Sequence, residues 1–327
     1  MAVETGTATD GLDFYNKLIS FLTTNAELVG LGQNWSVVWQ APVGAENETD
    51  VVVRGPGLAG GDAVYVAMRY TANVAQDAYY ISIRGATGFL PDSEEFDEHV
   101  NVTPSSVRMF VDSGTHSYWF TANGRRFMAV AKISTTFEAM YAGLFLPYAT
   151  PLSYPYPMFI GGSAGPTDTD GPINWRTIND NHSHFVEPHY NSGVAFVDTG
   201  AWMLNPAGSW LRVAARGSIA PVGIDPITSG GTYFPPEGSD TSNYGLPGRF
   251  VLQNTMDALG GDRILWPCTL LQYGDVSQTY GILDGAYRCQ GYMNAAENLI
   301  TYNTVDHLVV PNVYRSDLRD YWAMAME

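Results

Sequence analysis

Basic residues are scarce in this chain of 327 residues. Sixteen Lys and Arg stand against 33 Asp and Glu, which gives a formal net charge of -17. A field of this sign repels phosphate backbones, so we expect no direct binding to nucleic acid. Lys17 and Lys132 are the two lysines, and every other basic residue is an arginine. Arginine suits bidentate and partly buried contacts, so the bias indicates either extensive buried contact surface or a GC-rich genome.

Cysteine is rare as well, with only Cys268 and Cys289. Their spacing matches no zinc motif, and free cysteines are commonly buried. We predict two free buried thiols, with a disulfide between neighbouring strands as the alternative. No run of about 18 apolar residues occurs, so no membrane-spanning helix is expected. Residues 1–15 lack a basic segment followed by an apolar one, so no signal peptide is expected.

Motifs of catalysis are missing too. The sequence has no G-x-S-x-G, no glycine-rich phosphate loop and no nucleophilic Cys/His signature. The glycine-rich residues 55–62 (GPGLAGGD) join two predicted strands and are interpreted as a flexible hairpin loop. Acidic residues are so numerous that some carboxylate pair is always available, which makes that signal uninformative. We therefore predict a protein that is not an enzyme and holds no cofactor.

Aromatic residues make up 13% of the chain, and together with branched residues they form its clearest sequence pattern. From Trp35 onward they form short runs, such as DAVYVAMRYTA and AYYISIRGATGF, separated by Gly, Pro, Asn or Asp. This pattern predicts a mainly β fold over residues 35–327, an antiparallel β-sandwich of jelly-roll-like type. Residues 143–192 and 220–248 are rich in Gly, Pro and aromatics and are predicted to be long insertion loops. A domain split near residues 220–250 is the alternative to one domain.

The clearest helix lies near the start of the chain. Apolar residues recur at helical spacing from Leu12 to Leu28, after Asp10 as an N-cap and before Gly30, which predicts a helix at about residues 11–29. Residues 1–34 are thus expected to be an N-terminal arm and helix. At the other end, residues 321–326 alternate as a strand does, and residues 302–305 are typical of a hairpin turn.

Three histidines form the densest pattern of metal-ligand residues. His182, His184 and His189 lie in NDNHSHFVEPHY, and the first two would share one face of a strand. Their spacing matches no named zinc motif, so we expect a polar loop packed against neighbouring chains rather than a metal site. Asp168 and Asp170 resemble part of a calcium loop but lack its other ligands, and a solvated loop is predicted there.

Residues 117–135, SYWFTANGRRFMAVAKIST, predict a β-hairpin. Asn123-Gly124 between two alternating runs is the typical sequence of a type I′ turn, and it would pair residues 118–122 with 125–130. Arg125 and Arg126 would then point to opposite faces of the strand, so no shared basic patch is expected. At least one of these arginines should pair with a carboxylate, in this chain or in a neighbouring subunit.

Two blocks of the chain resemble virion structural proteins of tailed bacteriophages and prophages. The first block is residues 118–163, which run from YWFTANGRRFMAVAKIST to YPYPMFIGGS. The second is residues 280–327, with an L-D-G strand, an N-A-A-E-N segment, VDHLVVPNVYR and a terminal DYWA. The N-terminal helix and the W-x3-W strand are compatible with the same family. Neither block contains a catalytic motif, so the resemblance implies no active-site residues.

The resemblance implies a repeated structural subunit of the tail or baseplate. Such a protein assembles in the host cytoplasm and resides in the virion. Its partners would be copies of itself and tail-tube, sheath or baseplate proteins, contacted through its loops and N-terminal helix. The predicted interface residues are Arg125, Arg126, Tyr148, Tyr154, Tyr156 and Phe159.

A carbohydrate-binding module on the virion surface is the alternative function, with a glycan as partner. A β-sandwich can present aromatic rings for stacking on sugars, and the candidates are Trp119, Trp175, Trp202 and Trp210. A glycosidase that acts on the host envelope is a third hypothesis, for which the sequence offers only its many carboxylates.

Overall fold

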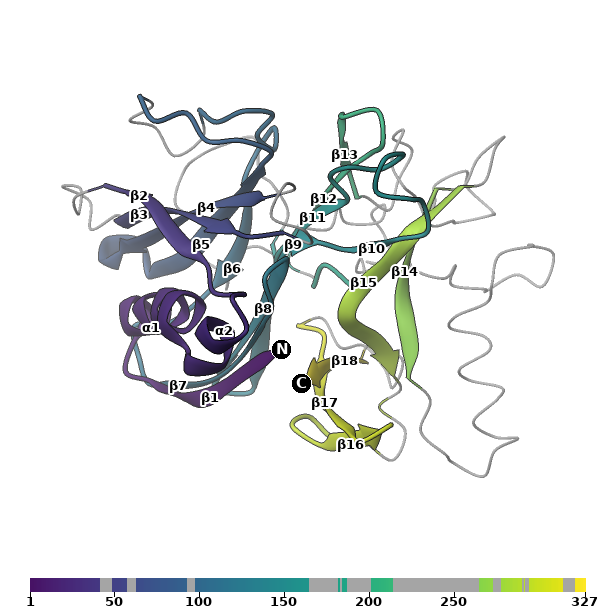
Figure 1. The fold of residues 1–327 in the computed structure, drawn as a ribbon. Helices are drawn as coiled ribbons and strands as arrows, with labels where there is room; N and C mark the ends of the chain where they lie inside the picture. Colours follow the sequence, from purple (N-terminus) through teal and green to yellow (C-terminus); the bar gives the residue numbers. More distant parts are fainter. Residues whose placement is uncertain are drawn as a thin grey trace, which may run out of the picture.

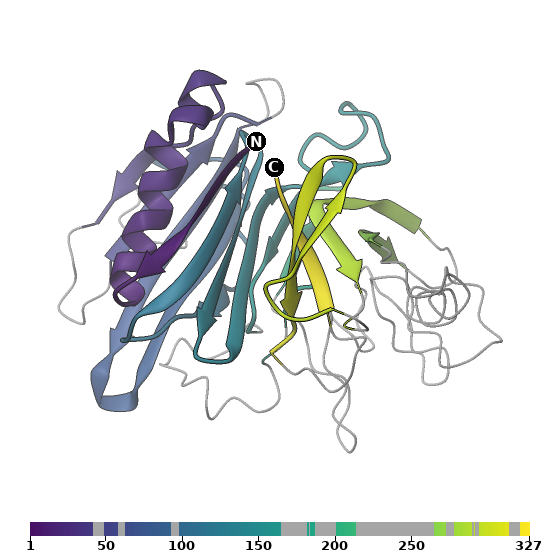
Figure 2. The same ribbon diagram turned by 90° about the horizontal axis from the view of Figure 1, so that it is seen from below.

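The computed structural model is built mainly from antiparallel β-strands. It describes residues 1–41, 49–57, 63–92, 98–164, 182, 184–186, 201–213, 265–272, 278–289, 291, 294–313 and 321–327. The described strands form three sheets, which follow one another as layers in Figures 1 and 2. The predicted mainly β, antiparallel, sandwich-like class is confirmed, with three sheets in place of the two of a simple sandwich.

The N-terminal sheet has the strand order β2-β3-β4-β5-β6. Its strands are β2 (Ser36–Gln40), β3 (Thr49–Gly55), β4 (Val64–Asn73), β5 (Ala78–Ala86) and β6 (Val107–Phe110), with the short helix η1 (Val74–Gln76) between β4 and β5. Neighbours in this sheet are also consecutive in the chain. This order is a meander and differs from the jelly-roll-like order that was expected.

The central sheet has the order β1-β7-β8-β9-β11-β12-β13. Its strands are β1 (Ala2–Ala8), β7 (His116–Ala122), β8 (Arg126–Ile133), β9 (Thr136–Leu144), β11 (Met158–Gly161), β12 (Ala201–Leu204) and β13 (Trp210–Arg212). Residues 2–8, predicted as part of an arm, thus form an edge strand, which pairs with β7 from Ala2 opposite Ala122 to Ala8 opposite His116. Strands β10 and β11 lie within residues 143–192, so this stretch is not only an irregular loop.

The C-terminal sheet has the order β10-β15-β18-β17-β16, and β14 also pairs with β15. Its strands are β10 (Leu146–Pro147), β14 (Trp266–Gln272), β15 (Gln278–Cys289), β16 (Leu299–Tyr302), β17 (Val305–Pro311) and β18 (Tyr321–Met326). The predicted terminal strand is confirmed as β18. The predicted turn is confirmed as well, because Asn303 and Thr304 have φ of 49° and 69° and Tyr302 pairs with Val305, as a type I′ turn requires.

The central sheet is buried on both faces. Phe127, Ala129 and Ala131 of β8 belong to the apolar cluster shared with the N-terminal sheet. Met128 and Val130 of the same strand belong to the cluster shared with the C-terminal sheet. Strands β8 and β9 are therefore buried along nearly their whole length, unlike an antiparallel strand with one wet face.

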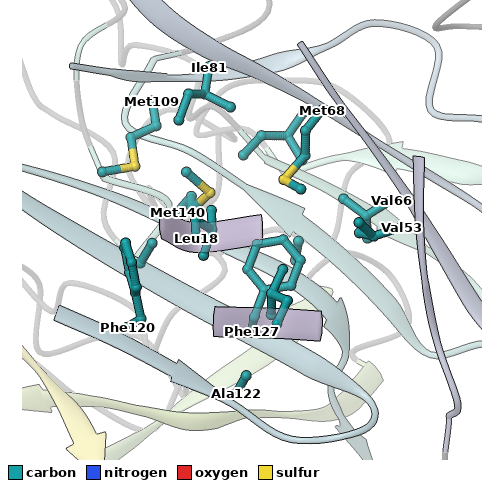
Figure 3. Packing of buried hydrophobic residues seen from close by; sticks show 14 of the residues in the cluster. Leu18, Val53, Val66, Met68, Ile81, Met109, Phe120, Ala122, Phe127 and Met140 are labelled. Atoms are coloured by element: carbon teal, nitrogen blue, oxygen red, sulfur yellow. The ribbon is translucent and has the colours of Figure 1, made fainter. Parts of the chain in front are cut away.

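Figure 3 shows part of the cluster between the N-terminal and central sheets. Leu18 comes from the N-terminal helix, Met68 and Ile81 from the N-terminal sheet, and Phe120 and Phe127 from the central sheet. Burial of each such side chain contributes about 1.5–3 kcal/mol relative to exposure. The helix therefore packs against both sheets and shares their apolar core.

The predicted helix over residues 11–29 is divided into α1 (Gly11–Thr24) and α2 (Ala26–Gly30). Asp10 caps α1, since its Oδ1 accepts a hydrogen bond of 2.8 Å from the amide of Asp13. Asn25 separates the two helices, with an extended ψ of 127°, and its Oδ1 accepts from the amides of Glu27 and Leu28 at 3.0 and 3.3 Å. An asparagine can stop one helix and cap the next because its side chain replaces a backbone acceptor.

Both cysteines are buried and unbridged, as predicted. Cys268 belongs to the cluster between the central and C-terminal sheets, and Cys289 belongs to a separate cluster with Val309 and Tyr321. Among the described residues, no helix is long and apolar enough to cross a membrane. The predicted insertion at 220–248 and the alternative split near 220–250 lie outside the described residues.

Candidate functional site

The turn between β7 and β8 is built around the side chain of Asn123. Its Oδ1 accepts hydrogen bonds from the amides of Arg125 and Arg126 at 3.0 and 3.1 Å, and the amide of Asn123 donates to the carbonyl of Arg126 at 3.0 Å. None of Asn123, Gly124 and Arg125 has a positive φ, whereas a type I′ turn requires it at both central residues. The predicted type I′ turn at Asn123-Gly124 is therefore wrong. The side-chain oxygen of Asn123 takes the place of a backbone acceptor, and the two central residues of the turn are Gly124 and Arg125.

This shift also corrects the prediction that the two arginines point to opposite faces. Arg125 is a turn residue and β8 begins at Arg126, so strand alternation does not apply between them. Both arginines contact one carboxylate oxygen of Asp284 in β15, with Nε distances of 3.1 Å for Arg125 and 3.3 Å for Arg126. The predicted carboxylate partner exists, and it belongs to the same chain.

Asp284 is the acceptor for three donors. The Nδ2 of Asn123 lies 3.0 Å from the same oxygen that the two arginines contact. Burial by itself raises the pKa of this carboxyl, but the charges of Arg126 and Arg125 and the hydrogen bonds from Asn123 and Arg125 outweigh burial, so the pKa lies below its ordinary value. We call Asn123, Arg125, Arg126 and Asp284 the turn junction.

The turn junction joins all three sheets. The indole Nε1 of Trp35, next to β2, donates to the carbonyl of Asn123 at 2.9 Å, and the amide of Gly57, which follows β3, donates to the carbonyl of Gly124 at 2.9 Å. Arg126 is fully buried, and its Nη1 donates to the hydroxyl of Thr121 at 3.0 Å. Arg126 was predicted to lie at an interface with another chain, but its side chain is enclosed within this one.

Two glycines permit this close approach. Gly143 has a φ of 132°, and a Cβ there would overlap the carbonyl oxygen of Arg125, which accepts from the amide of Leu144. Gly285 has a φ of 78°, and a Cβ there would overlap the guanidinium of Arg126. Glycine is needed at both places for space as well as for conformation.

A second junction surrounds Glu138, a buried residue of β9. Its carboxylate accepts from the hydroxyl of Ser163, and its Oε1 lies 2.8 Å from the Nε2 of His182. The ring of His182 also packs edge-to-face on Phe110 of β6, with centroids 5.1 Å apart. Ser, His and Glu are brought together, but the carboxylate stands between the other two. In a catalytic triad the histidine occupies that place, so this arrangement does not activate the serine.

His184 connects the same strand to the C-terminal sheet. Its Nε2 lies 2.7 Å from the carbonyl of Phe137, and its Nδ1 accepts from the indole Nε1 of Trp322 in β18 at 2.9 Å. Because Nδ1 accepts, Nε2 carries the proton and the ring is neutral. Burial lowers the pKa of His184 to about 3, against the hydrogen bond to Phe137, which favours the protonated ring. We call Glu138, Ser163, His182, His184 and Trp322 the histidine junction.

The histidine junction does not have the arrangement of a metal site. Both ring nitrogens of His184 are occupied by hydrogen bonds, and the Nε2 of His182 faces Glu138. Within the described part of the chain, no group of three or more His, Cys, Asp or Glu residues could hold a metal ion. His189, Asp168 and Asp170 lie outside the described residues.

The predicted aromatic interface residues divide into two groups. Tyr148 is exposed, with 64% of its surface accessible. Tyr154 and Phe159 are buried in the cluster shared with the C-terminal sheet, and Tyr156 packs partly buried against the other cluster. For Tyr154 and Phe159 the prediction of an intermolecular contact is wrong, because apolar packing within the chain already covers both rings.

The tryptophans proposed for glycan stacking do not form one surface. Trp119 packs against the cluster shared with the C-terminal sheet and stacks on Phe137, with centroids 6.2 Å apart. Trp202 and Trp210 pack against the cluster on the opposite face of the central sheet. Trp175 lies outside the described residues.

Sequence reasoning identified the two arginines but not their partner, and it missed Glu138. Asp284 lies in the L-D-G segment, where a charge next to a glycine in an apolar strand was a usable signal. Glu138 is a lone charge within TFEAMYAGL, a strand whose other residues are uncharged. A single acid in such a strand indicates a buried, hydrogen-bonded carboxylate.

Comparison with known proteins adds no assignment. No model of a known protein family matches the chain, and no curated protein matches it.

Proposed function

We propose that this chain is a non-enzymatic structural subunit of a tailed-bacteriophage virion, in the tail or baseplate region, which assembles through protein–protein contacts. The proposal rests on the resemblance of residues 118–163 and 280–327 to such proteins. It also includes assembly in the host cytoplasm, residence in the virion, and copies of itself and other tail proteins as partners.

One structural observation supports the proposal most. The two blocks that carry the resemblance lie more than a hundred residues apart in the sequence, yet they meet at the turn junction and where β10 pairs with β15. Arg125 and Arg126 of the first block contact Asp284 of the second, and Leu146 of β10 pairs with Ile282 of β15. The resemblance therefore covers an integral part of one packed scaffold, which fits a family defined by architecture better than one defined by an active site.

The chemistry of the histidine junction agrees with a role without catalysis. Glu138 separates Ser163 from His182, and the neutral His184 is held between Phe137 and Trp322. These groups satisfy one another's hydrogen bonds inside the fold, which is the ordinary state of buried polar groups that support a structure.

Mass spectrometry of purified particles from the phage or prophage that encodes the chain tests this proposal. We expect the chain in intact particles and in isolated tails, at a fixed copy number, with a position that a virion reconstruction can assign. Its absence from purified particles, when known tail proteins are detected in the same sample, would overturn the proposal.

A further inference from the structure

Strand β16 is the edge strand of the C-terminal sheet. It pairs with β17 on one side, from Leu299 opposite Leu308 to Tyr302 opposite Val305. Figure 1 shows β16 at the lower rim of the molecule, with β17 between it and β18. Its side chains are open to solvent as well, since Leu299 is 51% and Tyr302 is 59% accessible. An edge with exposed apolar side chains is a place where another strand can add.

The turn determines which backbone groups of β16 face away from β17. Tyr302 and Val305 flank a two-residue turn, and in such a hairpin the flanking residues exchange both backbone hydrogen bonds. Pairs with and without hydrogen bonds then alternate along antiparallel strands. The N–H and C=O groups of Leu299 and Thr301 therefore point outward, so the edge offers two donors and two acceptors with the spacing of a β-ladder.

A contact further along the hairpin supports this alternation. The amide of Val309 donates to the carbonyl of Asn298 at 2.8 Å, where the next hydrogen-bonded pair is expected. Among the described residues, no hydrogen bond joins the outward backbone groups of Leu299 and Thr301 to another segment. An extended polypeptide is the ligand that satisfies backbone donors and acceptors at this spacing.

Two other edges of the molecule are protected, whereas β16 is not. Strand β2 has a register shift between Val37 and Trp39, and such an irregularity blunts an edge against strand addition. At the edge strand β1, the Nζ of Lys17 donates to the carbonyl of Thr7 at 3.2 Å, so a lysine lies against that strand. Strand β16 has a regular register over its whole length and contains no proline or charged residue.

Charge indicates the chemistry of the strand that fits. Asp306 lies opposite Thr301 and accepts a hydrogen bond from its hydroxyl at 2.6 Å, so a carboxylate lies beside the free edge. Glu327 follows the β18 residue that pairs with Asp306 and adds a second negative charge. At the other end of β16, Glu297 already forms an ion pair with Lys132. A strand with a basic residue near Thr301 therefore complements this edge.

A second copy of the chain is disfavoured as the source of this strand. Its β16 would bring the same carboxylates to the contact, and each chain carries a net charge of -17. We propose that β16 binds an extended segment of a different protein, which pairs with the outward backbone groups of Leu299 and Thr301 and places a basic side chain near Asp306. Apolar side chains of that segment pack on Leu299 and Tyr302. This inference rests on the proposed role as an assembly subunit and names the kind of partner at one contact.

A synthetic peptide tests strand addition. The probe is a peptide of alternating valine and threonine with a lysine at each end, labelled with a fluorophore, and fluorescence anisotropy measures its binding to the full chain. We expect saturable binding that weakens at high salt, because salt screens the attraction between lysine and Asp306. The same peptide with glutamate in place of lysine should bind more weakly.

Thr301→Pro and Thr301→Val separate the backbone from the side chain. Both variants lose the hydroxyl contact to Asp306, but only proline removes the outward N–H, and an edge strand tolerates proline where the N–H faces solvent. We expect Thr301→Pro to weaken peptide binding by about tenfold or more, because a hydrogen bond is lost and the ring opposes close approach. Thr301→Val should bind as the unchanged chain does. Far-UV circular dichroism checks that both variants are folded.

Amide hydrogen exchange, followed residue by residue by NMR, provides a test that needs no variant. In the isolated chain, the amides of Leu299 and Thr301 should exchange faster than those of Ile300 and Tyr302, which bond to β17. Bound peptide should slow exchange at Leu299 and Thr301 and leave the other two amides unchanged, because strand addition covers only the outward groups.

Four results would overturn the contact: no binding of the lysine peptide, equal binding of the lysine and glutamate peptides, equal binding to folded Thr301→Pro and Thr301→Val, or slow exchange at Leu299 and Thr301 in the isolated chain, which would mean that the edge is already covered. If the chain is nevertheless present in purified particles, the role as a virion subunit stands and its contacts lie elsewhere. Absence from particles overturns that role whatever the peptide shows.

Discussion

The turn junction and the histidine junction connect the same three sheets with different chemistry. In the turn junction, two guanidinium groups and one amide converge on the carboxylate of Asp284. In the histidine junction, a neutral His184 links Phe137 to Trp322. The first stabilises the layers by opposite charges, whereas in the second the link from Phe137 to Trp322 runs through a neutral imidazole. The two should therefore respond differently to mutation and to acid.

Arg126→Ala should have the largest effect. Arg126 is fully buried, and its removal leaves Asp284 with one arginine fewer in a buried site. Breaking a buried pair by removing one partner costs about 3–5 kcal/mol. Urea unfolding followed by tryptophan fluorescence should show this loss, and a change under about 1 kcal/mol would mean that Arg126 adds little to the turn junction.

Gly285→Ala should cost about 3 kcal/mol or more, because it combines a φ of 78° with overlap on the guanidinium of Arg126. Gly208→Ala is the matched control, since Gly208 has a φ of 80° and a Cβ added there would meet no atom within 4 Å. The control should cost only the conformational strain, about 1–2 kcal/mol. Equal losses in the two variants would show that close packing against Arg126 is unimportant.

The histidine junction should weaken in mild acid. The pKa of His184 is about 3 in the folded chain and about 6.5 when unfolded. Below pH 6.5 the unfolded state therefore binds a proton that the folded state does not. The free energy of unfolding should fall by about 1.4 kcal/mol per pH unit from roughly pH 6 down to pH 3.

His184→Gln should remove this part of the pH dependence even though it destabilises the chain at neutral pH. The difference in unfolding free energy between the variant and the unchanged chain should then shrink as pH falls from 7 to 4. Asp284 contributes in another window, because its lowered pKa stabilises the fold above the ordinary value near 4 and this stability is lost below it. A constant difference across pH 4–7 would contradict the assignment to His184.

Arg125→Ala should have the smallest effect. The side chain of Arg125 is 26% accessible, and Arg126 and Asn123 still contact Asp284 when it is removed. Partly exposed ion pairs are worth about 0.2–1 kcal/mol. The same urea experiment measures this loss, and a loss as large as that of Arg126→Ala would show that the two arginines act as one unit.

Local patterns predicted much of the fold. Short runs of aromatic and branched residues predicted most strands of the three sheets, although β10 and β11 fell in a predicted loop, and helical spacing after Asp10 predicted α1. The turn at Asn303-Thr304 could be predicted because the conformation of a short turn depends mainly on the residues within it. Strand β1 was missed because AVETGTA has few large apolar residues. Its strand conformation depends on pairing with β7, which its own sequence does not show.

The site was predicted less completely, for reasons that individual residues make clear. Two adjacent arginines suggested a carboxylate partner, but Asp284 lies about 160 positions away in the chain and only packing brings it close. Tyr154 and Tyr148 look alike in a run of Pro and Tyr, yet one is buried and the other is exposed. Their difference depends on which sheet covers the loop, which no local pattern encodes.

Composition, charge and periodicity thus determined that this chain is an acidic, mainly β protein with an N-terminal helix, because these properties are summed over neighbouring residues. Tertiary structure decided that the central sheet is covered on both faces, that Arg125 and Arg126 share one carboxylate, and that β16 is left at the edge of its sheet. These outcomes depend on contacts between segments far apart in the sequence, whose free energies appear only when the sheets pack.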